Sequence, residues 1–122
     1  MRGTSVGTDC HAVMGAGANI AIFDEFDLVP GPGTASTQIV GALEVSAAGG
    51  ADLAKVLNGT SIGDECSLLL GEGANTAIVT SSSVGADLVI KTGKGDDHAT
   101  VNGNTVAGQI KIDLGSGNNI GP

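Results

Sequence analysis

The chain has 122 residues, of which 21 are glycine, and a formal net charge of −8 from 13 acidic and 5 basic residues. This length predicts a single domain that spans residues 1–122. The shortage of Lys, Arg and aromatic residues argues against nucleic acid as a partner, because phosphate binding needs clustered cations and base stacking needs aromatic rings. No stretch approaches the ~20 apolar residues of a membrane span, so we expect no membrane insertion.

One pattern returns along the chain, and each copy opens at a glycine. These glycines are Gly7, Gly41, Gly63, Gly85 and Gly108. Their spacings are 34, 22, 22 and 23 residues, so the first interval carries 12 extra residues. We place the extra residues in a loop at about 24–38, where Pro30 and Pro32 stand beside glycines. The repeat predicts roughly five coils of about 22 residues with one inserted loop.

Within each copy, apolar and polar residues alternate, which is typical of a strand with one buried face. The first strand gives three inward columns: Cys10, Leu43, Cys66, Leu88 and Ile110; Ala12, Val45, Leu68, Ile90 and Ile112; Met14, Ala47, Leu70, Thr92 and Leu114. The second strand gives two more: Ala21, Ala54, Ala77 and Ala99; Phe23, Val56, Val79 and Val101. Such stacking predicts an all-β fold, a right-handed parallel β-helix (β-solenoid) whose coils lie ~4.8 Å apart.

The Gly-rich turn between the two strands ends each time in an Asx residue. These residues are Asn19, Asp52, Asn75, Asp97 and Asn119. Asn and Asp side chains cap backbone amides at corners and tolerate the left-handed conformation. We therefore predict that this Asx ladder has a structural role.

Residues 91–101, KTGKGDDHATV, contain Gly93, Gly95 and Asp97 in the spacing G-x-G-x-D. In this spacing the segment resembles the calcium-binding nonapeptide repeats of RTX toxins and proteases. The resemblance implies calcium as a cofactor, with Asp96 and Asp97 as ligands and with Asp52 and Glu72 as neighbouring acids. The motif here occurs once per coil rather than in immediate tandem, so calcium binding is the alternative to the structural ladder.

Residues 39–120 as a whole are similar to the Gly/Asx-turn repeats of large bacterial surface and secreted proteins. The similarity is carried by units such as DLVIKTGKGDDHATVNGNTVAG. It implies a right-handed parallel β-helix with a surface or structural role, outside the cell or on a virus-like particle. It brings no catalytic residues with it.

The sequence offers no catalytic arrangement that we can defend. His11 and His98 fall on outward positions of different strands, and Cys10 and Cys66 share a column with Leu43 between them, so we expect neither a Cys/His pair nor a disulfide. The outward columns also lack the paired carboxylates of carbohydrate-cleaving β-helices. We predict a protein without enzymatic activity and keep a polysaccharide-acting enzyme as a third hypothesis.

Two features point to protein partners. The outward positions of the second strand are more apolar than solvent requires, at Ile20, Ile22, Leu53 and Ile78, which predicts contact with the inserted loop or with another subunit. No capping helix is predicted at either end of the repeat, and open strand edges promote pairing with other chains. The chain is then either a fragment of a longer array or a unit whose edges neighbouring copies complete.

We expect a structural protein that self-associates or decorates a surface, filament or virus-like particle, with a calcium-binding adhesion module as the alternative.

Overall fold

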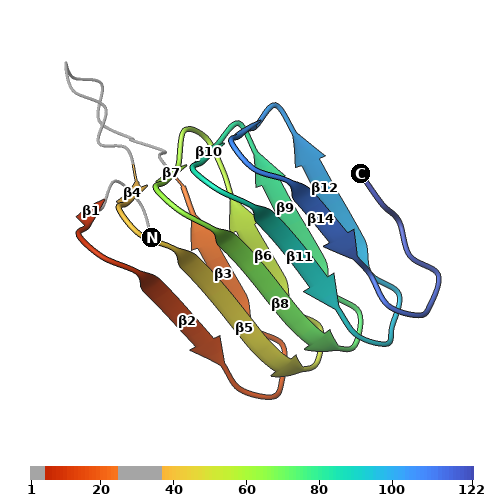
Figure 1. Cartoon of the computed structure of the whole chain (residues 1–122). Helices are drawn as coiled ribbons and strands as arrows, with labels where there is room; N and C mark the ends of the chain where they lie inside the picture. Colours follow the sequence, from red (N-terminus) through yellow and green to blue (C-terminus); the bar gives the residue numbers. More distant parts are fainter. Residues whose placement is uncertain (1–4, 25–36) are drawn as a thin grey trace.

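The computed structural model describes residues 5–24 and 37–122, so most of the loop predicted at 24–38 lies outside the described residues. The described residues form fourteen strands in three parallel sheets that wind into a β-solenoid (Figure 1). They include no helix that is long and apolar enough to cross a membrane. The predicted all-β fold with parallel sheets is confirmed.

Each sheet takes one strand from each successive pass of the chain. Sheet 1 contains β1 (Ser5–Val6), β4 (Gln38–Ile39), β7 (Ser61–Ile62), β10 (Ser83–Val84) and β13 (Thr105–Val106). Sheet 2 contains β2 (Cys10–Met14), β5 (Leu43–Gly49), β8 (Cys66–Glu72), β11 (Leu88–Thr92) and β14 (Ile110–Asp113). Sheet 3 contains β3 (Ile20–Phe23), β6 (Leu53–Val56), β9 (Thr76–Thr80) and β12 (His98–Asn102).

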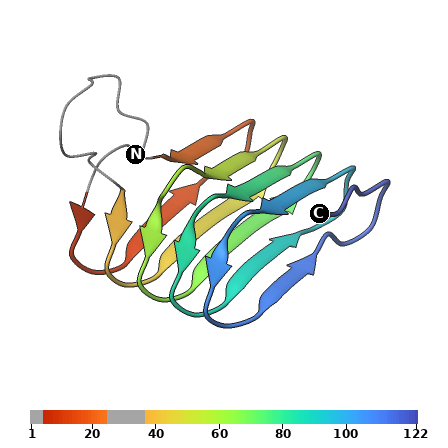
Figure 2. The same ribbon diagram turned by 90° about the horizontal axis from the view of Figure 1, so that it is seen from above.

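We call one pass of the chain through the sheets a rung. The N-terminal rung consists of β1, β2 and β3, and the C-terminal rung consists of β13, β14 and the turn that leads to Ile120. Figure 2 shows the rungs side by side in sequence order, with these two rungs at opposite ends of the stack. Every rung between them therefore has a neighbour on each side, whereas an end rung has one.

The strand register reproduces the predicted inward columns. Leu43 pairs with Cys10 in one neighbouring strand and with Cys66 in the other. In sheet 3, Ala77 lies between Ala54 and Ala99 in the same way. The central members of these columns are fully buried and form one core of aliphatic side chains. Like residues thus stack on like in parallel register, which is the packing that the alternation predicted.

Sheet 1 was not predicted, because the repeating pattern in the sequence indicated only two strands per copy. Its strands have two residues each, and a period of two cannot be read from two residues. Their inward members are nevertheless well buried, since Ile39, Ile62 and Val84 are almost inaccessible to solvent. The signal in the sequence is a β-branched residue that comes shortly before the opening glycine of each copy.

The opening glycines do not form one column, which corrects the predicted length of the insertion. Ile39 and Ile62 are register partners, yet Gly63 follows Ile62 directly whereas Gly41 comes two residues after Ile39. Register partners are 33 residues apart from Val6 to Ile39 and 22 apart in a later pair of strands, Ser61 and Ser83. The first interval therefore carries 11 extra residues rather than 12.

Candidate functional site

The Asx ladder is a directional chain of hydrogen bonds along the turns between sheets 2 and 3. In each step, the backbone N–H of one Asx residue donates to the side-chain Oδ1 of the Asx residue in the next rung. The donor and acceptor pairs are Asn19 and Asp52 at 3.0 Å, Asp52 and Asn75 at 3.1 Å, Asn75 and Asp97 at 2.9 Å, and Asp97 and Asn119 at 2.9 Å. Each side chain thus ties two successive turns together.

The asparagines of the ladder use their second side-chain atom within their own turn. Asn75 Nδ2 donates to the carbonyl oxygens of Gly71 and Gly73 at 3.1 and 3.0 Å. Asn19 Nδ2 makes the same two bonds, to Gly15 and Gly17. The amide group of an asparagine therefore donates to two carbonyl oxygens of its own turn.

The two aspartates of the ladder lack this donor. Their Oδ1 atoms accept the same ladder bond as the Oδ1 atoms of the asparagines, which places Oδ2 where an asparagine carries Nδ2. The Oδ2 atoms of Asp52 and Asp97 are buried and have no hydrogen-bond partner. Each of these turns consequently has a buried carboxylate oxygen without a donor, and only a donor or a cation satisfies such an atom.

The acidic residues predicted as a calcium site do not gather in one cluster. Asp96 is exposed and its Oδ1 accepts the N–H of Asn118 in the next rung, whereas Asp97 is buried and accepts from Asn75 in the preceding rung. Asp52 belongs to the same ladder as Asp97, with Asn75 between them. Across residues 5–24 and 37–122, no group of three or more His, Cys, Asp or Glu side chains has the geometry of a metal site.

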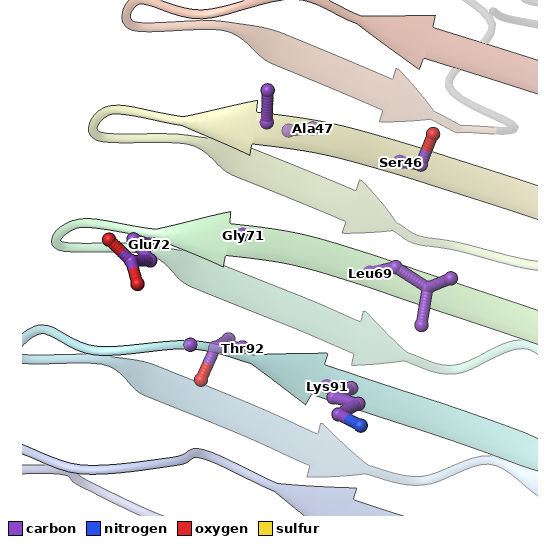
Figure 3. A pocket seen from close by; sticks show the side chains of 9 residues that line it. Ser46, Ala47, Leu69, Gly71, Glu72, Lys91 and Thr92 are labelled. Atoms are coloured by element: carbon purple, nitrogen blue, oxygen red, sulfur yellow. The ribbon is translucent and has the colours of Figure 1, made fainter.

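A groove of about 360 Å³ lies on the outer face of sheet 2, near the turns (Figure 3). It crosses β5, β8 and β11, and its charged residues are Glu72 and Lys91 beside the aliphatic side chain of Leu69. Hydrolysis of a glycosidic bond ordinarily uses two carboxyl groups, and Glu72 is the one carboxylate in this lining. This groove was not predicted from the sequence; its signal there is the run of small side chains at Ser46, Ala47 and Ala48.

The histidines lie apart and are both exposed. His11 Nδ1 is 3.4 Å from Glu44 Oε2 on the outer face of sheet 2, and His98 Nε2 is 3.3 Å from Thr100 Oγ1 on sheet 3. Both outward positions agree with the predicted alternation. The structure brings neither histidine to a thiol or to the other histidine.

An exposed ion pair connects the C-terminal rung to the rung before it. Lys111 Nζ lies 2.5 Å from Asp87 Oδ2, and Asp87 Oδ1 accepts the N–H of Gln109. The bond from Gln109, followed by that from Lys111, holds the pKa of Asp87 below its usual value. Because the folded-state pKa is lowered, this stabilisation is present at neutral pH and is lost as the pH falls through that lowered pKa.

The cysteines are free thiols in one column, separated by Leu43 as predicted. Burial, with a smaller effect from Glu65, raises the pKa of the Cys66 thiol to about 12, and Cys10 in the N-terminal rung is only half-buried. We expect a thiol reagent at pH 8 to modify Cys10 in the native monomer, at low protein concentration, and Cys66 only after unfolding, because burial keeps the Cys66 thiol protonated and the thiolate is the reactive form. In the variant Cys10→Ser, no thiol should react quickly with the reagent in the native state. A fast reaction of that variant would contradict the burial of Cys66.

The residues predicted as a protein contact lie on the outer face of sheet 3. Ile20 is exposed, and Ile22, Leu53 and Ile78 are half-buried. The register places Lys55 between Ile22 and Ile78, so the strip is interrupted by a cation. The structure brings the four apolar residues onto one face without joining them into a continuous patch.

Comparison with known proteins adds no assignment to this geometry. No protein-family model matches the chain, and neither the curated proteins nor the solved structures give a match. The function is therefore argued from the ladder, the core and the two end rungs.

Proposed function

We propose that the chain is a non-catalytic structural protein that self-associates through the faces of its N-terminal and C-terminal rungs. The observation that carries this proposal is the loss of burial at the end of an inward column. Leu88 is 0% exposed, whereas Ile110, its register partner in the C-terminal rung, is 51% exposed. Ile110 belongs to an inward column, yet half of it remains accessible to solvent. If another rung covered this side chain, the burial of its apolar surface would stabilise the contact.

The strand edges support the same proposal. Among the described strands, β2 and β14 are the outermost members of sheet 2, and each has a partner on one side only. Unpaired N–H and C=O groups along such an edge are a template for another strand. Parallel pairing to a second copy gives these groups the same partners that they have inside the stack.

We also propose the finer features of the solenoid. A right-handed path is supported by the general rule that crossovers between parallel strands of one sheet are right-handed in about 98% of cases. Five coils are supported by the five strands in each of sheets 1 and 2. The length of a coil, 22 residues, follows from the register partners Ser61 and Ser83.

Light scattering over a range of protein concentrations tests self-association. We expect a mass above that of the monomer, rising with concentration and unchanged by a chelator, because apolar contact and strand pairing need no metal. The variant Ile110→Lys should shift the distribution towards monomer, because it places a charge on the exposed end of the core while leaving the interior intact. A wild-type protein that stays monomeric at millimolar concentration would remove the proposal.

A calcium-binding module is the second candidate, and one observation favours it. The unpartnered Oδ2 atoms of Asp52 and Asp97 are buried at turns that also carry carbonyl oxygens. Calcium prefers carboxylate and carbonyl oxygens, so Asp97 with the carbonyl groups of Gly93 and Gly95 would be the ligands in the clearest case. When bound, the ion would supply the positive charge that these turns lack.

A further inference from the structure

Two glycines at corners inside the stack, Gly63 and Gly71, lie too close to the preceding rung to carry a side chain. A Cβ atom built on Gly63 would lie 1.9 Å from the carbonyl oxygen of Val40, and one built on Gly71 would lie 1.9 Å from that of Ala48. No side chain fits at such distances from backbone. The second rung carries Val40 and Ala48 themselves at the corresponding positions, so the close approach is a property of particular rungs.

The N-terminal rung has glycines at the same two corners, Gly7 and Gly15, but nothing stands in their way. A Cβ atom on either residue would have no atom within 4 Å among the described residues. Neither residue has a positive φ, so the backbone conformation does not require glycine either. Glycine without such a reason lowers stability relative to alanine, because it loses more conformational freedom on folding. Without side chains, these two corners leave room for a rung that packs against the N-terminal face.

The C-terminal rung has the shape of that missing neighbour. Following the register through sheet 2, Ile110 shares a column with Cys10 and Ile112 shares one with Ala12. A C-terminal rung placed before the N-terminal rung of a second copy would bring the backbone near Ala107 to Gly7 and the backbone of Gly115 to Gly15. These are the close approaches that Gly63 and Gly71 make inside the stack.

The Asx ladder ends in complementary groups. The Oδ1 atom of Asn19 accepts no hydrogen bond in the described residues, and the N–H of Asn119 donates none. In every step of the ladder, an N–H donates to the Oδ1 atom of the following rung. The N–H of Asn119 and the Oδ1 atom of an Asn19 in a second copy therefore form the next step with the correct direction.

Four of the five large apolar side chains that are exposed among the described residues belong to the two end rungs. These are Val13 (83%) and Ile20 (68%), which point outward from sheets 2 and 3 in the N-terminal rung, and Ile110 (51%) and Ile120 (61%) in the C-terminal rung; the fifth is Val40 (63%) in the second rung. Ile120 continues the column of His98 in sheet 3, to which Ile20 also belongs. Joining the two faces would place Ile120 beside Ile20.

We propose that the partner in self-association is a second copy of this chain, joined head to tail with residue 110 facing residue 10. Sheets 1 and 2 and the Asx ladder then run from copy to copy in one parallel register. This proposal rests on the self-association proposed above and adds to it the partner, the faces and the register.

Cross-linking tests the register directly. The variant Ile110→Cys should form an intermolecular disulfide with the native Cys10 under mild oxidation, because paired Cα atoms in adjacent parallel strands are ~4.8 Å apart, within the range of disulfides. Lys111→Cys, one residue away on the outer face, should not form this disulfide. Adding Cys10→Ser should abolish the ladder of covalent oligomers on a non-reducing gel.

The outcomes separate this proposal from the broader one. A wild-type protein that assembles while the Ile110→Cys product survives loss of Cys10 overturns the head-to-tail register and leaves self-association standing. A wild-type protein that remains monomeric overturns both. A disulfide that forms with Ile110→Cys, is absent with Lys111→Cys and depends on Cys10 supports the proposal.

Discussion

Replacing Leu68 with alanine is expected to lower the free energy of unfolding by about 2–5 kcal/mol. Leu68 is fully buried in the middle of β8, with Val45 and Ile90 as its register partners on the two sides. The hydrogen bonds between rungs hold these neighbours at the fixed spacing of a parallel sheet, so the backbone has little freedom to close the cavity. The cost therefore includes both the lost apolar burial and the empty volume.

Urea unfolding followed by circular dichroism measures this loss. Leu69→Ala is the matched control, since Leu69 is the next residue in the same strand and its side chain lines the outer groove. We expect that change to lower the free energy of unfolding much less than Leu68→Ala does. Equal losses in the two variants would show that the alternation of inward and outward side chains in sheet 2 is wrong.

Replacing Asp97 with asparagine is expected to raise the free energy of unfolding in a chelator by about 1–3 kcal/mol. The substitution supplies an amide donor at the position of the unpartnered Oδ2, where Asn75 makes two bonds to its own turn. The ladder bond from Asn75 to residue 97 is kept, because asparagine retains Oδ1. The opposite change, Asn75→Asp, should lower the free energy of unfolding by a similar amount.

Asp96→Asn is the control for the loss of one negative charge, because Asp96 is exposed and adjacent in sequence. We expect it to change stability little in a chelator. A variant Asp97→Asn that unfolds at a lower urea concentration than the wild type would contradict the view that Oδ2 lacks a partner.

The same variants decide the calcium candidate. If calcium occupies the turn of Asp97, millimolar calcium raises the melting temperature of the wild type, and Asp97→Asn loses that part of the response because the carboxylate ligand is gone. A wild-type melting temperature that does not respond to calcium removes this candidate. The expected stabilisation by Asp97→Asn in a chelator is independent of that result.

The fold could be predicted where the alternation is long enough to be read. The segment Leu88–Thr92 has five residues that align with those of its neighbouring copies, so its inward side could be inferred from the sequence, and its burial alternates in the structure. A two-residue strand such as Ser61–Ile62 has no period, and sheet 1 was missed for that reason. The opening glycines were misleading as markers, since Gly41 and Gly63 occupy different positions of the same corner.

The candidate site was predictable in position and not in chemistry. The spacing of the turn motif located Asp97 and Asn75 in one ladder, and the structure joins them by a hydrogen bond. Asp96 and Asp97 looked like a pair of ligands in the sequence but bond to different rungs, because Asp97 accepts from Asn75 in the preceding rung and Asp96 accepts from Asn118 in the next. Whether the Oδ2 atom of Asp97 lacks a donor depends on which of the two carboxylate oxygens accepts the ladder bond. The sequence does not contain that information.

The alternation of Asn and Asp along the ladder has a consequence for how such an array lengthens by duplication. Asp52 and Asp97 are separated by the rung of Asn75, so their buried carboxylates lie two rungs, ~9.6 Å, apart. Tandem duplication of the single rung that carries Asp97 would set two buried carboxylates in adjacent rungs, where like charges repel at half that distance. Duplication of two rungs together, one with Asn and one with Asp, would keep the charges apart, so the pair of rungs is the unit by which we expect this solenoid to grow in evolution.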